Sequence, residues 1–192
     1  MPEKTYSNIL NVSNRKEFRK WLEENSENEK ECWIKVKKSR PEEENVFYYL
    51  DAVEEALCFG WIDSTHAKIN GIDMQRFGPR QKNSPWTELN KERVRRLENL
   101  GLMTERGRAV LPEMGKRSFI PDNEIIAELK KERVWSAFKR FPKLYQRVRL
   151  YNLQFYKDRK MIAEYERGLK HVIEATREGK MFGEWNDYGR LI

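Results

Sequence analysis

The stretch that decides the fold spans residues 50–90 and reads LDAVEEALCFGWIDSTHAKINGIDMQRFGPRQKNSPWTELN. Apolar side chains recur at helical spacing from Leu50 onward, and Gly60 can adopt the left-handed conformation that ends a helix. Two β-like runs follow, and the Asn70-Gly71 pair between them is the strongest short signal for a hairpin. A loop with two prolines then leads to Thr87, a good N-cap residue. The stretch therefore predicts a helix, a hairpin, a rigid loop and a second helix.

The two-residue turn at Asn70-Gly71 also predicts the register of the hairpin. In that register Asp63 and Arg76 are diagonal neighbours on one face of the sheet, roughly 7–8 Å apart between backbones and within reach of each other's side chains. The pairs expected on this face are Ile69–Ile72, Ala67–Met74, Thr65–Arg76 and Asp63–Gly78.

The whole pattern predicts an α+β fold with a small antiparallel β-sheet. Residues 32–38 alternate apolar and basic side chains, as half-buried strands do, so strands are expected near 32–38, 61–69 and 72–78 with flanking helices. From residue 122 onward apolar residues keep helical spacing, which predicts an all-helical C-terminal module. A chain of 192 residues fits one domain, or a domain with a small appendage. We therefore expect an α+β domain over residues 1–118 and a helical module over residues 119–192 that packs on it.

Basic residues outnumber acidic ones, with 38 Lys and Arg against 31 Asp and Glu and a net charge of +7. Seven of the basic residues and two of the acidic ones fall between residues 76 and 96. This excess allows nucleic acid, anionic metabolites or anionic lipid as partners, and solubility alone explains it equally well. Glu54 and Glu55 lie opposite the apolar stripe of their helix, so both are expected to face solvent.

Several classes of protein are not expected. No apolar run approaches the ~20 residues that a membrane span needs, and the first residues lack the apolar region of a signal peptide, so we expect no membrane insertion. Cys32 and Cys58 lack the spacing of a metal site, which predicts free thiols, a cytoplasmic location, no metal and no cofactor. No nucleophile–base pair is visible: His66 is expected on the hairpin face away from Asp63, and His171 beside core positions. Catalysis is therefore open but not favoured.

A ligand site is expected where the helix before the hairpin, the mouth of the hairpin and the helix after Thr87 meet. A helix N-terminus and arginines favour an anion, and two tryptophans offer flat apolar walls, so a small phosphate or carboxylate or a peptide terminus would suit. Alternatively, the same residues form core and hold the loop. Nucleic-acid binding through residues 76–96 and contact with a partner protein are further alternatives. The candidate ligand-binding residues are Trp61, Asp63, Arg76, Arg80, Ser84, Trp86 and Asn90.

Four motifs in the sequence are distinctive. They are VEEALCFGWID at residues 53–63, RFGPR at 76–80, SPWT at 84–87 followed by Asn90, and GLMT at 101–104 followed by Gly107. Together they resemble the YdeI/OmpD-associated family of small bacterial proteins, and the C-terminal part is similar to that family's helical module. Gly78 stands where the family often has Ser or Thr, and Thr87 where it often has Ser. The resemblance implies a shape, a binding site and a role in bacteriocin or envelope-stress protection, but no reaction.

Overall fold

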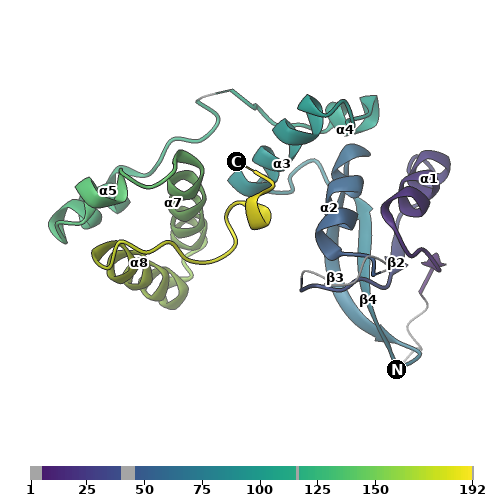
Figure 1. Cartoon of the computed structure of the whole chain (residues 1–192), viewed down its shortest axis with the longest axis horizontal. Coiled ribbons are helices and arrows are strands. Elements are labelled where there is room, and N and C mark those ends of the chain that lie inside the picture. The colour runs from purple at the N-terminus through teal and green to yellow at the C-terminus, as the bar shows by residue number, and fades with distance from the viewer. Residues whose placement is uncertain (1–5, 40–45, 116, 192) are drawn as a thin grey trace. The chain divides into compact units, whose positions relative to one another are not determined.

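The computed structural model describes residues 6–39, 46–115 and 117–191, and it divides into two compact units (Figure 1). The first unit comprises Met1–Pro85 and Val94–Pro112, and the second comprises Trp86–Arg93 and Glu113–Ile192. The division therefore falls within one helix, and residues 86–93 group with the C-terminal helices. The α+β fold class predicted from the sequence is confirmed.

In the described part of the first unit, the strands form a mixed four-stranded sheet in the order β1-β2-β4-β3. β1 runs parallel to β2, and the other pairs are antiparallel. The strand expected over residues 32–38 is shorter, because the chain leaves the sheet after Ile34 and Lys37 bridges to Tyr48 instead. The elements are β1 (Ile9–Leu10), α1 (Arg15–Asn25), β2 (Cys32–Ile34), α2 (Tyr49–Cys58), β3 (Trp61–Ile69), β4 (Ile72–Pro79), α4 (Glu105–Ala109) and the second half of α3 (Glu88–Asn99).

The β3–β4 hairpin keeps the expected register near its turn and then changes it. Ile69 lies opposite Ile72, as predicted. Farther from the turn a β-bulge shifts the register by one residue, so Asp63 lies opposite Phe77 and not opposite Gly78. Because side chains alternate along a strand, the inserted residue moves everything beyond it to the other face of the sheet. The prediction that Asp63 shares a face with Arg76 is therefore wrong.

Gln75 on β4 supports this bulge. Its side chain is buried, with a relative exposure of 3%. Its amide nitrogen donates hydrogen bonds to the carbonyl oxygens of Ser64 and Thr65, both at 3.2 Å. A bulge leaves backbone groups without partners in the ladder, and a buried side-chain amide can satisfy them. A single side chain on β4 thus stabilises the altered register of β3.

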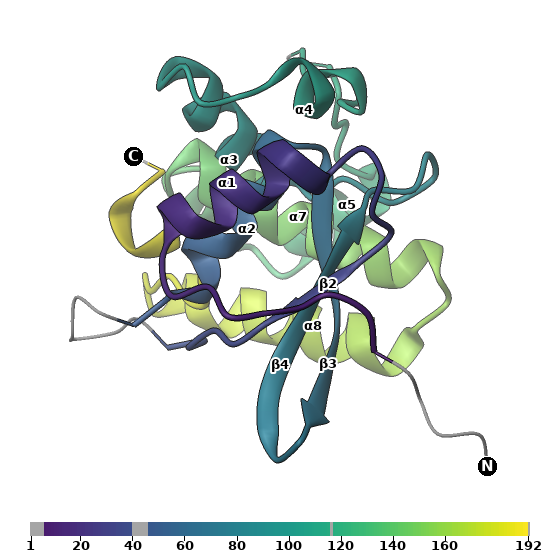
Figure 2. The ribbon, with the colours of Figure 1, turned by 90° about the vertical axis from the view of Figure 1, so that its right-hand side faces the viewer.

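The two faces of the sheet are covered by different parts of the chain. On one face Phe18 of α1 makes an edge contact with Phe77, at 5.5 Å between ring centroids. On the other face the ring of Tyr6 contacts Trp33, at 5.1 Å between ring centroids. Figure 2 shows the turn of the β3–β4 hairpin extending past α1 and α2. The apolar residues buried beneath Tyr6 are Trp33, Ile69 and Met74.

The junction between α2 and β3 depends on small residues. Gly60 ends α2 with a positive φ of 72°, as predicted. Thr104 caps α4 by accepting a hydrogen bond from the Gly107 N–H (3.2 Å), and its hydroxyl donates to the Cys58 carbonyl at 2.6 Å. A Cβ at Gly107 would collide with that carbonyl. Glycine at position 107 therefore lets α4 approach the end of α2.

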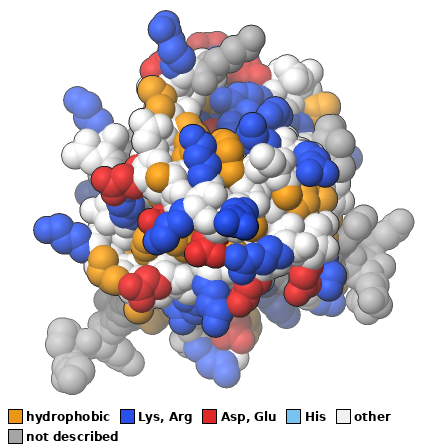
Figure 3. Space-filling view, turned by 90° about the vertical axis from the view of Figure 1, so that its left-hand side faces the viewer, with side chains coloured by type: hydrophobic (Ala, Val, Ile, Leu, Met, Phe, Trp, Pro, Cys, Tyr) orange, Lys and Arg blue, Asp and Glu red, His pale blue; other side chains and the backbone are white. Residues whose placement is uncertain are grey.

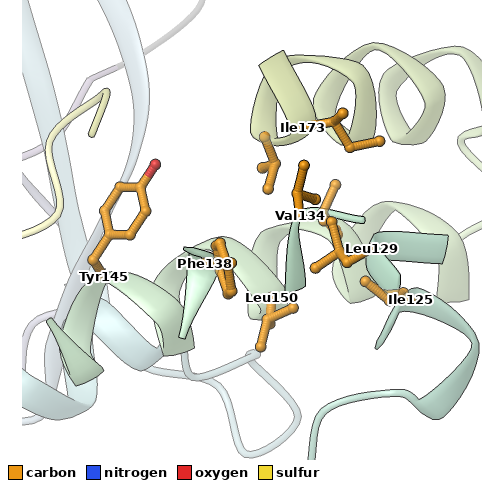
Figure 4. Packing of buried hydrophobic residues seen from close by; sticks show 9 residues of the cluster. Ile125, Leu129, Val134, Phe138, Tyr145, Leu150 and Ile173 are labelled. Atoms are coloured by element: carbon orange, nitrogen blue, oxygen red, sulfur yellow. The ribbon is translucent and has the colours of Figure 1, made fainter. Parts of the chain in front are cut away.

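The described part of the second unit is helical, as predicted for residue 122 onward. Its core gathers apolar side chains such as Leu129, Val134 and Ile173, which lie together in Figure 4. None of the helices within residues 6–39, 46–115 and 117–191 is long and apolar enough to cross a membrane. Besides the first half of α3, the elements are α5 (Asn123–Lys131), α6 (Trp135–Phe138), α7 (Lys143–Asp158), α8 (Ile162–Arg177) and the 3-10 turn η1 (Asp187–Gly189).

Candidate functional site

The residues expected to bind a ligand are engaged in the fold itself. Trp61 has a relative exposure of 1%, its Nε1–H donates to the Ser26 carbonyl at 3.1 Å, and its ring meets Trp21 edge-on at 5.6 Å. These are the contacts of a core tryptophan, since a buried indole N–H needs a partner. Trp61 therefore fits the alternative of a structural role.

Asp63 and Arg76 bind different partners. Asp63 accepts a hydrogen bond from the Tyr49 hydroxyl on α2 at 2.6 Å. Arg76 donates through Nε to Glu31 at 2.6 Å and through Nη1 to Ser64 at 3.2 Å. The bulge places the two side chains on opposite faces of the sheet, so each finds its partner on its own side.

Arg80 and Ser84 belong to the loop after β4. The Arg80 N–H donates to the Gly60 carbonyl at 2.9 Å, and its Nη1 donates to the Pro85 carbonyl at 3.0 Å. The Ser84 N–H donates to the Gln81 carbonyl at 2.9 Å. Arg80 thus joins the start of the loop to its end and to the junction after α2.

Trp86 and Asn90 lie in the second unit, whereas the other five candidate residues lie in the first. Trp86 is half-buried. The Asn90 N–H donates to the hydroxyl of Thr87, which caps α3 as predicted. The Asn90 side chain accepts a hydrogen bond from Arg93 at 2.7 Å, and Arg93 also binds Asp187 at 2.7 and 2.8 Å.

The basic cluster over residues 76–96 is extensively paired with carboxylates. Arg76 binds Glu31, Arg93 binds Asp187, and Arg96 donates to Glu54 at 2.9 Å. Figure 3 draws a different face, the left-hand side of Figure 1 where α5 and α8 are labelled, and there too Lys and Arg side chains are interspersed with acidic and apolar ones. These pairs weaken the basis for nucleic-acid binding, which needs cations that are available to phosphates.

The partner of Arg96 corrects a second expectation. Glu54 and Glu55 do not face solvent: their relative exposures are 0% and 3%. Arg15 donates to Glu54 and Glu55 at 2.8 Å each, and Arg19 donates to Glu55 at 3.0 Å. Burial alone would lower the pKa of Arg15, but the charges of Glu55 and Glu54 raise it above its usual value. The two carboxylates therefore join α1, α2 and the second half of α3.

A cleft of about 260 Å³ lies between α7 and α8. The two helices approach closely at Gly168, where a Cβ would lie 3.2 Å from the Leu153 side chain. Phe182, which follows α8, lines the cleft beside Arg149 and His171. The polar lining residues are Arg149, Asn152 and Tyr156 from α7, and Glu164, Arg167 and His171 from α8.

Arg149 is the most deeply buried of these charged groups, with a relative exposure of 8%. Its guanidinium lies over the rings of Phe182 and Tyr145, at 4.5 and 5.3 Å from their centroids. A Cβ at Gly183 would lie 3.0 Å from its Nη2, so glycine at position 183 leaves room for the cation. No hydrogen bond to Nε and no carboxylate partner of Arg149 occurs among the described residues.

Burial lowers the pKa of Arg149, with only the Tyr145 phenol opposing. The side chains of Asn152, Glu164 and Arg167, which line the same cleft, make no hydrogen bond or ion pair with any residue that the structure describes. This differs from Arg15, Arg19, Arg76, Arg93 and Arg96, each of which binds a carboxylate. Charged groups are seldom buried unpaired. The polar groups of the cleft are thus available to a bound molecule.

Comparison with known proteins identifies a family. The model of a domain of unknown function, DUF8412, matches residues 10–110. The chain belongs to this family. Searches of curated proteins and of solved structures found no match.

The DUF8412 match runs from the second residue of β1 to just past α4 and therefore includes the buried Glu54 and Glu55 with their arginines. The cleft between α7 and α8 lies outside the matched residues. No cluster of three or more His, Cys, Asp or Glu side chains that could hold a metal ion occurs within residues 6–39, 46–115 and 117–191. The chemistry available in the cleft is therefore that of its arginines, amide, carboxylate and rings.

Sequence reasoning missed both groups of charges. The sequence did contain a signal for the Glu54–Glu55 network. Arg15 and Arg19 are spaced to share one side of a helix, and two adjacent glutamates follow on the next helix. Arg149 lies in a run of alternating basic and apolar residues on α7 and resembles an ordinary surface arginine in the sequence. Its burial becomes visible only when Phe182 and Gly183 are placed beside it.

Proposed function

We propose that this protein binds a small anionic molecule in the cleft between α7 and α8. The observation that carries the proposal is the burial of Arg149 without a carboxylate partner. A buried cation costs free energy unless it is paired, so an unpaired one is expected where a ligand supplies the negative charge. The guanidinium is well suited to this, because its N–H groups match the oxygens of a carboxylate or phosphate.

His171 and Arg167 also offer N–H groups to an anion in the cleft. His171 stacks on the Phe182 ring at 3.8 Å, and Arg149 lies over the same ring. Arg167 also lines the cleft, one turn of α8 away from His171. A ligand anion beside Phe182 would therefore contact Arg149 and His171, with Arg167 one turn of α8 farther along the cleft.

This proposal places the anion site in the α7–α8 cleft and no longer at residues 61–90, where the sequence had predicted it. The contacts of Trp61, Asp63, Arg76 and Arg80 support structural roles for those residues. We also propose a role in bacteriocin or envelope-stress protection, which is supported only by the resemblance of the sequence motifs to those of the YdeI/OmpD-associated family. Its test is the sensitivity of cells that lack the gene to bacteriocins.

Thermal denaturation in the presence of anions tests the binding proposal. Inorganic phosphate, acetate and citrate are each added to the wild-type protein and to the Arg149→Met and Arg108→Met variants. Arg108 pairs with Glu98 on the surface, so its variant carries the same charge change away from the cleft. We expect at least one anion to raise the melting temperature of the wild type and of Arg108→Met, but not of Arg149→Met, since ligands stabilise the state that binds them.

The stability of the unliganded variants gives a second readout. A buried charge that serves to bind a ligand does not stabilise the unliganded fold. The free energy of unfolding of Arg149→Met should therefore equal that of the wild type or exceed it by about 1 kcal/mol. If Arg149→Met instead loses more than about 2 kcal/mol, Arg149 anchors the aromatic rings around it and the proposal is wrong. The proposal also fails if no anion shifts the melting temperature of the wild type.

A further inference from the structure

The charged groups of the α7–α8 cleft are arranged with opposite signs at its two ends. Arg149 and His171 contact Phe182 at one end. Glu164, which also lines the cleft, precedes His171 by seven residues on α8. Seven residues are two helical turns, so both side chains emerge on the same side of α8, about 10 Å apart along its axis. The cleft is therefore cationic at one end and carries a carboxylate at the other.

Glu164 limits what the cleft can bind. It makes no hydrogen bond or ion pair with any described residue, and Arg167, three positions later on the same helix, does not pair with it. A free carboxylate repels a compact ligand whose only charge is negative, and such repulsion is a common source of specificity. The same group attracts a ligand that carries an ammonium group about 10 Å from its anion.

The middle of the cleft is also polar. Asn152 lies one turn of α7 beyond Arg149, and its side chain makes no hydrogen bond with any described residue. Its side-chain amide offers both a donor and an acceptor, which is the complement of a peptide group. The cleft volume of 260 Å³ equals that of about nine liquid waters, which accommodates a short chain but not a folded partner.

On the basis of the proposed anion site, we infer that the ligand is a short peptide of about three residues, bound with its C-terminal carboxylate at Arg149 and its N-terminal ammonium at Glu164. Three extended residues span about 10 Å, the axial distance between the two ends of the cleft. Asn152 then bonds a peptide group between them. The C-terminal carboxylate is a recurrent recognition element in peptide binding.

Titrations with triglycine test this inference on the full chain, with binding followed by chemical-shift changes in two-dimensional NMR spectra. Three probes are compared: triglycine, N-acetyltriglycine and triglycine C-terminal amide. The proteins are the wild type, Glu164→Gln and the control Glu166→Gln, which changes the same charge at an exposed position of α8. Circular dichroism checks that each variant is folded.

We expect the C-terminal amide to bind at least tenfold more weakly than triglycine, because it leaves Arg149 unpaired. N-acetylation should weaken binding to the wild type and to Glu166→Gln by about fivefold, the scale of one partly exposed ion pair. In Glu164→Gln the free and acetylated peptides should bind equally.

Two results would overturn the inference while leaving anion binding intact. One is equal binding of triglycine and N-acetyltriglycine by the wild type, with no effect of Glu164→Gln. The other is no binding of triglycine by a protein that phosphate, acetate or citrate stabilises through Arg149. If neither those anions nor triglycine binds, the proposed anion site itself is wrong.

Discussion

Glu54 provides the sharpest test of how the first unit is held together. Replacing it with Gln keeps the shape of the side chain but removes the charge. The wild-type carboxylate accepts hydrogen bonds from Arg15 at 2.8 Å and from Arg96 at 2.9 Å, in a position with no solvent exposure. In the variant one of the two oxygens becomes an NH2 group that faces a guanidinium, so one charge-assisted bond is lost and the other is weakened.

The expected loss follows from these two bonds. A hydrogen bond to a charged group contributes about 1.5–3 kcal/mol, and breaking a buried pair leaves arginines that can partly recover hydration because both remain about one-third exposed. We therefore expect Glu54→Gln to reduce the free energy of unfolding by about 2–3 kcal/mol. With an m-value of about 2 kcal/mol/M, the urea midpoint measured by circular dichroism would fall by about 1 M.

Glu98→Gln is the matched control, because Glu98 pairs with Arg108 on the surface and surface pairs contribute about 0–1 kcal/mol. If Glu54→Gln costs no more than Glu98→Gln, the buried network does not contribute net stability. The reasoning from burial and bond geometry would then be refuted for α1, α2 and α3.

Three further predictions concern single side chains of the first unit. Burial would raise the pKa of Glu31, but hydrogen bonds from Arg76, Trp33 and Ser7 lower it to about 2. The ionised carboxylate should therefore add about 1 kcal/mol to the free energy of unfolding after solvent screening. This contribution should be complete above pH ~4.5 and lost as the pH falls toward 2. Urea midpoints of the wild type and Glu31→Gln should therefore converge below pH 3. Burial and then the charge of Glu55 raise the pKa of the Cys58 thiol to about 12, and burial also raises the pKa of the Cys32 thiol. A thiol reagent should therefore label both cysteines at least ~100-fold faster in denaturant than in buffer. Fast labelling of the native protein would contradict their burial. Gly107→Ala should cost about 2–4 kcal/mol in urea unfolding because its Cβ would collide with the Cys58 carbonyl, whereas Gly115→Ala, with one side-chain oxygen at 3.4 Å, should be nearly neutral.

Turn and cap chemistry made much of the first unit predictable. Asn70-Gly71 predicted the turn and the pairing next to it, and Gly60 and Thr87 marked helix ends at the positions where the structure has them. These signals are local, since each depends on the conformation of a few adjacent residues. The α+β class followed from the same alternation of helical and strand periods.

The bulge could not be predicted by the same means. It depends on a buried amide on β4 that bonds two carbonyls on β3, and a Gln in a strand gives no sign of that use. A one-residue shift then reverses the face of every residue beyond it, so the errors for Asp63 and Arg76 had one cause. Pairing rules that start from the turn fail where the register changes.

Long-range pairing explains the remaining differences. Glu54 and Glu55 find arginines about forty residues earlier in the chain, at Arg15 and Arg19, and forty-two residues later, at Arg96. A charged residue opposite an apolar stripe usually faces solvent, so the helical periodicity led to the wrong prediction that both glutamates are exposed. Arg149 is important for the opposite reason, because no carboxylate among the described residues pairs with it. The lack of a partner cannot be recognised from the sequence.

The bulge at Ser64 and Thr65 has a consequence for how molecules of this protein meet one another. β3 is an outer strand of the sheet, and an outer strand is a template on which a strand of another molecule can pair and start aggregation. The bulge interrupts the regular row of backbone groups along β3, and the opposite outer strand, β1, has only two residues. Among the described residues, neither edge of the sheet therefore offers a long, regular surface for a foreign strand, and the side chain of Gln75 contributes to this protection by supporting the bulge.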